Sequence, residues 1–361
     1  MFLAIREFKH AKLRFLLISL IMILISLLVL FVSGLAKGLS FDNASAIESM
    51  VPNNLVLQKE SDRQINHSFI SENQIDEVRK YVNDKNSATL GVQMTTFMEN
   101  GSSKKLDATL FAIDVDGVLS PEVIEGKMID HTTTNEVIGD ISLKEEGIKI
   151  DDKIIDQTSG QEFIIVGFTK NQTYSHTPVI HLNNKEWSMI KNNNSYNAIA
   201  LKADSNSLEK IEKNVSGIEV ISKKQALKGV PGFKEEQGSL MMMITFLFFI
   251  GAVVLAVFFY VMTIQKINQF GVLKAIGSNI RYLSKNIIYQ ILTLTLISLF
   301  ISISLTFGFS KIIPTTLPFV FDLKLVLGSS VLFLLVALVG SLLSLYRIIK
   351  IDAIEAIGRA Y

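Results

Sequence analysis

The chain of 361 residues contains no cysteine and only six prolines. Without thiolates it cannot form disulfides, iron–sulfur clusters or thiolate zinc sites, so its folded parts are held by packing alone. All six prolines fall between four long apolar runs. Because proline disrupts the interior of a helix, each of these runs can form one uninterrupted helix.

Charged residues are also missing from the four runs, which cover Phe15–Ala36, Gln237–Gln265, Asn286–Ser310 and Leu325–Tyr346. With a rise of about 1.5 Å per residue, each run can cross the hydrocarbon core of a membrane, which is roughly 30 Å thick. The first run is longer than the apolar core of a signal peptide, so we interpret it as an uncleaved anchor. The sequence predicts a multi-pass membrane protein with four transmembrane helices.

Basic residues mark one side of the membrane. The flanks before the first run, between the second and third runs, and after the fourth carry eleven Lys and Arg residues against three Asp and Glu residues. Since Lys and Arg favour the cytoplasmic side, both termini are predicted to be cytoplasmic. Residues 37–236 then lie outside, with 22 basic and 30 acidic residues. The overall charge of +1 argues against a nucleic-acid partner.

The predicted organisation follows from these boundaries. The segments are a cytoplasmic N-terminal segment 1–14, transmembrane helix 15–36, an extracellular domain 37–236, transmembrane helix 237–264, a cytoplasmic segment 265–285, transmembrane helix 286–310, an extracellular loop 311–324, transmembrane helix 325–346 and a cytoplasmic tail 347–361. The external segment is far too long for a connecting loop. It should be a folded domain inserted between the first and second helices.

Both helices and strands are expected in the external domain. Ser71–Gln74 and Ser222–Gln225 have the S-x-x-Q form of a capping box, which starts a helix. Strand-like runs rich in β-branched and aromatic residues are Ala108–Ile113, Phe163–Phe168, Val179–Leu182 and Ala198–Leu201. The expected fold class is therefore an all-α transmembrane region with an α+β extracellular domain.

Motifs for nucleotide and metal chemistry are missing. The chain has no G-x-x-x-x-G-K-[ST] stretch, the loop that cradles nucleotide phosphates, so no ATPase site, no catalytic residue and no permanently bound cofactor are expected. His67, His131 and His181 lack the spacing of metal ligands, and no metal site is predicted on the chain alone.

Three stretches resemble segments of one family of permeases. The residues Gln269, Phe270, Gly271, Val272, Leu273, Lys274, Ala275, Ile276 and Gly277 are similar to a cytoplasmic segment usually written R-E-I-G-V-L-R-A-I-G. The tail Ile351–Ile357 resembles the ending P-x-x-A-L-R. In the external part, Ile124–Lys127, Val137–Asp140 and Phe163–Phe168 resemble the progression G-R…V-V-I-G…F-x-V-V-G-I. The family that these stretches resemble includes MacB, FtsX and the lipoprotein-releasing permeases.

This resemblance implies the permease half of a type VII-like ABC exporter. A separate cytoplasmic ATPase would hydrolyse ATP and push on residues 269–277 and on the tail, and the permease would work as a homodimer. From the residues alone, the segment 265–279 is also explained as an amphipathic helix lying on the membrane surface. Gly251, Ala252 and Ala256 form a small-residue face that suits either a second copy or this chain's own helices.

Within the family, the stretches Met1–Glu7, Tyr174–Pro178 and Val230–Gln237 are similar to the haem-efflux permeases of Gram-positive bacteria. Phe233 stands where several of those members carry tyrosine. The resemblance implies the cell membrane of a Gram-positive bacterium and haem as the exported substrate.

Candidate haem contacts lie where the second run enters the outer leaflet. Haem is an apolar disc with two propionates and an iron that accepts Met, His or Tyr as axial ligand. Lipid contact, helix packing and ordinary solvation also explain residues of these types. The candidates are Glu235, Glu236, Met241, Met242 and Met243, with Phe246, Phe248 and Phe249 one turn deeper, and Tyr174 and His176 in the external domain.

Two alternatives stay open. The cargo could be an antimicrobial peptide, a lipid or a lipoprotein. The chain could instead be a mechanical transmitter that controls an extracellular cell-wall hydrolase and transports nothing.

Overall fold

The computed structural model describes residues 12–99, 104–191, 195–266, 269, 271–273, 276–313 and 317–349. The chain divides into two compact units. One comprises Met1–Leu39 and Gly238–Tyr361, and the other comprises Ser40–Gln237.

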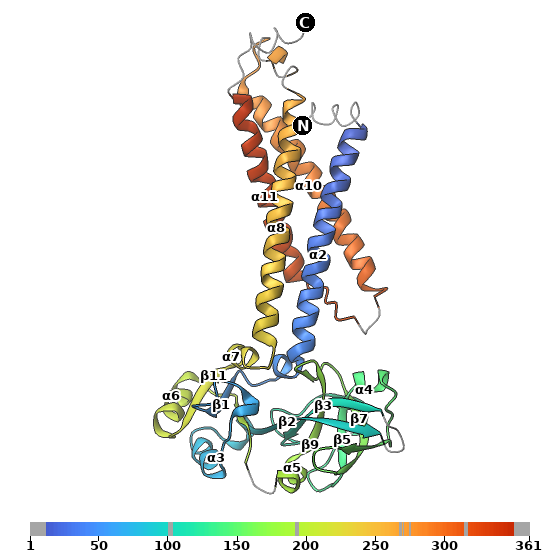
Figure 1. The fold of residues 1–361 in the computed structure, drawn as a ribbon. Coiled ribbons are helices and arrows are strands. Elements are labelled where there is room, and N and C mark those ends of the chain that lie inside the picture. Colours follow the sequence, from blue (N-terminus) through green and yellow to red (C-terminus); the bar gives the residue numbers. More distant parts are fainter. Residues whose placement is uncertain are drawn as a thin grey trace. The chain divides into compact units, whose positions relative to one another are not determined.

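Four long helices build the first unit (Figure 1). They are α2 (Lys12–Ser49), α8 (Phe233–Ile264), α10 (Ile280–Ser310) and α11 (Leu323–Ile349). Each is long and apolar enough to cross a membrane, which confirms the four predicted transmembrane helices. Their shared core contains buried apolar side chains from all four, among them Met22, Phe259, Ile291 and Phe333.

Hydroxyl groups join α2 to α10. The hydroxyls of Ser26 and Ser302 lie 2.5 Å apart, and Ser302 Oγ lies 2.9 Å from the carbonyl oxygen of Ile23. Ser298 Oγ donates to the carbonyl oxygen of Ser19 at 3.4 Å. In lipid such interhelical bonds contribute about 0.6 to 2 kcal/mol each, so they fix the pairing of two otherwise apolar helices.

Two glycines let α2 approach the segment before α11. A Cβ atom at Gly38 would lie 2.0 Å from the carbonyl oxygen of Pro318, and one at Gly34 would lie 2.6 Å from the ring of Phe319. The backbone N–H of Val320 donates to the carbonyl oxygen of Gly34 at 3.2 Å. Only a residue without a side chain permits this approach.

The second unit is built on a mixed sheet. In the described residues it has eleven strands, in the order β11-β1-β10-β2-β3-β9-β5-β7-β4, with β6 paired to β2 and β7 and with β8 paired to β9. The β3–β9 and β5–β7 pairs are parallel and the other pairs are antiparallel. The strands are β1 (Asn54–Gln58), β2 (Ser87–Glu99), β3 (Lys105–Ile113), β4 (Val123–Gly126), β5 (Glu136–Asp140), β6 (Lys153–Asp156), β7 (Glu162–Thr169), β8 (Thr173–Tyr174), β9 (Thr177–Asn183), β10 (Ala198–Leu201) and β11 (Ile218–Ser222).

Short helices accompany the sheet. They are α3 (Glu72–Arg79), α4 (Ser142–Glu145), α5 (Asn184–Lys191), α6 (Ser205–Asn214) and α7 (Lys223–Lys228). The two predicted capping boxes start α3 and α7, and all four predicted strand runs lie in strands, namely in β3, β7, β9 and β10. The helix and strand content predicted for residues 37–236 is thereby confirmed.

The end of α2 belongs to this second unit. The helix kinks at Ala44, which has non-helical φ and ψ of −147° and 29°. Beyond the kink, Ala46 and Ile47 are buried in the main core of the sheet domain. The last turns of α2 therefore pack as part of the sheet domain rather than as part of the helical unit.

Candidate substrate surface and coupling segment

One face of α8 carries exposed methionine and phenylalanine side chains. Met241 is 64% exposed, and Met242, Phe246 and Phe249 are exposed as well. Their helical spacing places them around one apolar pocket of about 570 Å³, which Gly238 and Thr245 complete. We call Met241, Met242, Phe246 and Phe249 the methionine face. Met243 is also exposed but does not line this pocket.

The methionine face belongs to the least covered of the four helices. In the described residues, 11% of the membrane-crossing part of α8 is buried within the chain, against 33%, 39% and 28% for α2, α10 and α11. The hydroxyl of Thr245 donates to the carbonyl oxygen of Met241 at 2.8 Å, so the pocket wall offers little polarity. Such a surface binds lipid, a flat apolar ligand or another apolar helix.

The acidic start of α8 is held by the sheet domain. Glu236 accepts a hydrogen bond from the side-chain amide of Asn43 at 2.7 Å, and its Oε2 lies 3.1 Å from His176 Nε2. The other ring nitrogen of His176 lies 2.9 Å from Asp42 Oδ2. We call Asp42, Asn43, His176 and Glu236 the histidine clasp. It ties the end of α2, the turn between β8 and β9, and the start of α8 to one another.

Charge favours the protonated form of His176. Burial is the largest single effect and lowers its pKa, but the hydrogen bonds to Asp42 and Glu236 and the negative charges of both carboxylates together outweigh it. The pKa of His176 therefore lies above its usual value. Ser175 and His176 both adopt left-handed backbone conformations, with φ of 52° and 61°, because the β8–β9 turn is tight.

Tyr174 does not reach the surface with its neighbour His176. Its side chain is fully buried, its ring centroid lies 5.5 Å from that of Phe111, and its hydroxyl has no hydrogen-bond partner among the described residues. Burial raises the pKa of this phenol. The structure places the Tyr174 side chain in the core of the sheet domain, whereas His176 and Glu236 meet in the histidine clasp.

The segment that follows α8 is partly described. Phe270, Lys274, Ala275 and the tail Ile351–Ile357 lie outside the described residues. Leu273 packs against the helical core, whereas Val272 and Ile276 are exposed, Ile276 to 78%. The backbone N–H of Ile276 donates to the carbonyl oxygen of Val272 at 3.1 Å, which closes a helical turn. The segment is thus anchored on one side and presents apolar residues on the other.

A buried lysine fixes the end of α8 beside this segment. Lys266 donates to the side-chain oxygen of Gln290 on α10 at 2.7 Å and lies 5.4 Å from the ring centroid of Phe15 on α2. From the sequence alone, Lys266 was one of the basic residues that flank the second apolar run. Its role in joining three helices depends on long-range contacts that no local pattern predicts.

Comparison with known proteins decides the family. The chain is 33% identical over 360 residues to "Putative hemin transport system permease protein HrtB" from two strains of Staphylococcus epidermidis, and the match covers 99% of each chain. The family described as "FtsX-like permease C-terminal" matches residues 241–353. The chain belongs to the FtsX-like permeases. A protein of the same name from Staphylococcus haemolyticus is 30% identical to this FtsX-like permease over 356 residues, or 99% of each chain.

Two solved structures show weaker likeness to this FtsX-like permease. The periplasmic region of MacB from Actinobacillus actinomycetemcomitans has a TM-score of 0.39 and 12% identity, and the match covers 51% of this chain and 95% of that one. The extracellular domain of the noncanonic ABC-type transporter YknZ from Gram-positive bacteria has a TM-score of 0.35 and 13% identity, with 47% and 100% covered.

The family match places the candidate sites in two classes. The methionine face and the segment 269–277 lie within the matched residues 241–353. The histidine clasp and Tyr174 lie before residue 241 and outside that match. The protein is an ABC-type, multi-pass membrane permease.

Proposed function

We propose that this FtsX-like permease exports haem from the membrane as a homodimer, using ATP that a separate cytoplasmic subunit hydrolyses. The observation that carries the proposal is full-length similarity to relatives named for hemin transport. Within the chain, the methionine face supports it, because thioethers and aromatic rings suit both the iron and the porphyrin.

The proposed contacts start on α8. Met241 and Met242 would supply the thioether that approaches the iron, with Met243 beside them, and Phe246 would stack on the macrocycle. Glu235 and Glu236 stand in the first turn of the same helix and offer carboxylate oxygens to ferric iron. Since Glu236 is bonded to Asn43 and His176, its use as a ligand would open the histidine clasp.

Tyr174 would join the site only in another conformation. Its phenol faces the core of the sheet domain, so haem contact requires the β8–β9 turn to lift away. Opening of the histidine clasp would remove the contacts of His176 to α2 and α8. The bonds of Ser175 to Asn43 and of Thr173 to Ser45 would have to break as well before the turn lifts. Substrate binding and movement of the sheet domain would then be linked.

Two exposed surfaces support the proposed partners, a second copy of the chain and a cytoplasmic ATPase. The low burial of α8 within one chain leaves room for the second copy of a homodimer. The exposed Val272 and Ile276 offer an apolar contact to the cytoplasmic ATPase, and the anchored Leu273 would pass its movement to the helices. Gln269, Phe270, Gly271, Lys274, Ala275 and Gly277 complete the proposed coupling segment.

A haemin titration in lipid nanodiscs tests the substrate. We would follow the Soret band of the wild type and of a Met241→Leu/Met242→Leu/Met243→Leu variant, which keeps volume and removes the thioethers. The control is Met94→Leu/Met189→Leu, since these two methionines are also exposed but lie on the sheet domain. We expect saturable binding that weakens at least about tenfold, equal to 1.4 kcal/mol, only in the α8 variant.

The same titration can overturn the proposal. Binding no stronger than to empty nanodiscs would remove haem as the substrate. A peptide, lipid or lipoprotein cargo, or a transmitter acting on a cell-wall hydrolase, would then take its place, while membership of the permease family would stand.

A further inference from the structure

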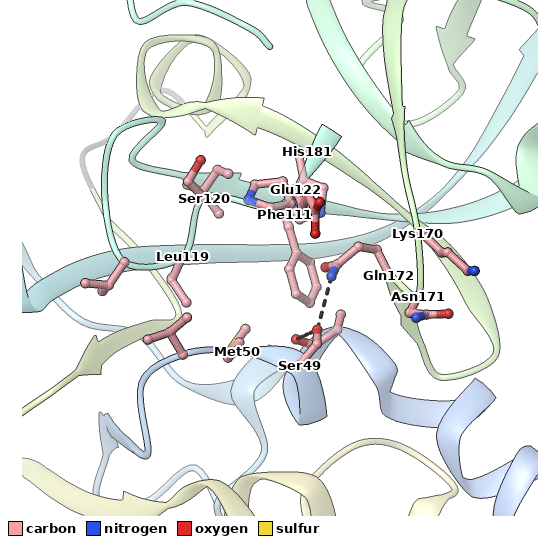
Figure 2. A pocket seen from close by; sticks show the side chains of 15 residues that line it. Ser49, Met50, Phe111, Leu119, Ser120, Glu122, Lys170, Asn171, Gln172 and His181 are labelled. Atoms are coloured by element: carbon pink, nitrogen blue, oxygen red, sulfur yellow. Dashed lines mark hydrogen bonds between the residues drawn. The ribbon is translucent and has the colours of Figure 1, made fainter. Parts of the chain in front are cut away.

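A second pocket lies wholly within the sheet domain (Figure 2). Its volume is about 370 Å³, within the range of small-molecule sites. The walls come from the end of α2, from β3 and β9, from residues 118–122 and from the turn 170–172. It shares no lining residue with the histidine clasp or the methionine face.

His181 on β9 is the unusual member of this wall. Its side chain is only 2% exposed, and neither ring nitrogen has a hydrogen-bond partner among the described residues. Its ring meets Phe111 edge-on, with centroids 6.0 Å apart and planes at 87°. Buried polar groups in folded proteins are nearly always hydrogen-bonded, so a buried imidazole that lines a pocket without a partner points to a ligand.

The imidazole is neutral in this environment. Burial lowers the pKa of His181 to about 3. A neutral imidazole offers one N–H donor and one bare nitrogen acceptor. It therefore pairs best with an uncharged group that both donates and accepts, and a hydroxyl is the smallest such group.

The rest of the pocket separates apolar walls from a charged mouth. Phe111, Ile113 and Leu119 provide apolar surface, and they are buried. Glu122 and Lys170, of opposite charge, are exposed and line the same pocket. A ligand with an apolar body, a hydroxyl and both charges would therefore find a partner for each of its parts.

The turn at the mouth is fixed in place. Gln172 donates its side-chain amide to Ser49 Oγ at 3.1 Å, which the dashed line in Figure 2 marks, and its backbone N–H donates to Asp140 Oδ2 at 2.7 Å. Asn171 holds the left-handed conformation of the turn with φ of 59°. The pocket is therefore bounded by positioned side chains on the side of α2.

We propose that this pocket binds a small zwitterion carrying a phenol, such as an aromatic amino acid, whose hydroxyl meets His181 while its ammonium and carboxylate face Glu122 and Lys170. The site is separate from the proposed haem contacts. It would let the sheet domain of the permease respond to a small molecule on its own side of the membrane.

Isothermal titration calorimetry on the full-length protein in nanodiscs tests this site with two probes, L-tyrosine and L-phenylalanine. The probes differ only by the hydroxyl, and their charge keeps them out of the lipid. We expect saturable binding of tyrosine and at least tenfold weaker binding of phenylalanine. Equal affinities, or no binding of tyrosine up to its solubility limit, would overturn the proposal.

Two variants assign the binding to the pocket. His181→Phe should abolish the preference for tyrosine, whereas His67→Phe, which changes an exposed histidine of the same domain, should keep it. Val118→Phe adds bulk to the pocket wall, leaves His181 in the sequence and should weaken both probes. Tyrosine binding that survives both His181→Phe and Val118→Phe would place the ligand elsewhere and refute the assignment.

The unfolding midpoint of His181→Phe distinguishes a histidine that binds a ligand from one that only stabilises the fold. Because the imidazole has no partner among the described residues, replacing it by an apolar ring should leave the unfolding midpoint unchanged or raise it. A clear fall in the midpoint, together with unchanged tyrosine binding, would show that His181 serves packing alone.

Discussion

The Nε2 atom of His176 lies 3.1 Å from Oε2 of Glu236, although the two residues are 60 positions apart in the chain. Asp42 holds the opposite ring nitrogen at 2.9 Å. One imidazole thus connects two carboxylates that stand at the ends of two transmembrane helices. When the imidazole of His176 is protonated, its positive charge attracts both carboxylates.

The histidine clasp should make stability depend on pH. Because the pKa of His176 is raised in the folded protein, its contribution is complete below the unfolded value of about 6.5 and is lost as pH rises through the higher folded value. The groups that face the ring are the carboxylates of Asp42 and Glu236 and the uncharged amide of Asn43. Solvent screening limits the effect to at most about 1 kcal/mol, or roughly 2 to 4 °C.

We therefore expect His176→Gln to lower the unfolding midpoint relative to the wild type at pH 6 and to match it at pH 9. Differential scanning fluorimetry at four pH values measures this, with the exposed His67→Gln as control. A difference of the same size at every pH would contradict a role for the imidazolium charge.

Tyr174→Phe should separate stability from substrate binding. The hydroxyl is buried without a described partner, and leaving such a group unbonded costs about 1 to 3 kcal/mol, so removing it should keep or raise the free energy of unfolding. If the phenol contacts haem after the turn lifts, the variant should bind haemin less tightly despite its stability. Denaturant titration measures the free energy of unfolding, and the Soret titration measures the affinity for haemin. A variant with lower stability and unchanged haemin affinity would leave Tyr174 as a core residue only.

Gly38→Ala should destabilise the helical unit. The added methyl group would meet the backbone of Pro318, which cannot move aside as a side chain can, and overpacking of this kind costs about 1 to 3 kcal/mol. Gly328→Ala on α11 is the matched control, because a Cβ there has no heavy atom within 4 Å. Thermal unfolding in detergent should show a loss for the first variant alone. Equal unfolding midpoints for Gly38→Ala and Gly328→Ala would refute the close approach of α2 to the backbone of Pro318.

Val272→Asp/Ile276→Asp should uncouple ATP hydrolysis from export. Both side chains are exposed and apolar, and a carboxylate in an apolar contact is costly to bury. We expect normal haemin binding in nanodiscs but loss of ATP-driven haem efflux from cells that express the partner ATPase. Ile312→Asp is the control, since Ile312 is equally exposed, at 78%, on the loop predicted to face outside. Efflux at the wild-type level in the double variant would place the coupling contact elsewhere.

The four transmembrane helices were predictable from the sequence for a simple physical reason. Bilayer thickness sets a minimum length for an apolar run, so length and missing charge alone identify each helix. The capping boxes at Ser71 and Ser222 were equally predictable, because each involves side chains only three residues apart. The proposed roles of residues 269–277 and of the methionine face come from a motif and from helical spacing, and they stay predictions.

Strand β2 (Ser87–Glu99) was missed because its sequence carries Gly91 and several threonines without a clean alternation. The strand is stabilised by pairing with β3, β6 and β10. Cross-strand neighbours come from distant parts of the chain, so this pairing has no local pattern to predict it.

Because local patterns act over a few residues, they were enough to identify the apolar helices, the starts of two short helices and four of the strands. The tertiary structure alone decided the environments of single polar side chains. Tyr174 and His176 are two positions apart, yet one is buried beside Phe111 and the other bridges Asp42 and Glu236. His181 became notable only when packing removed its ring from water, because the protonation and bonding of a histidine depend on neighbours that folding brings from elsewhere in the chain.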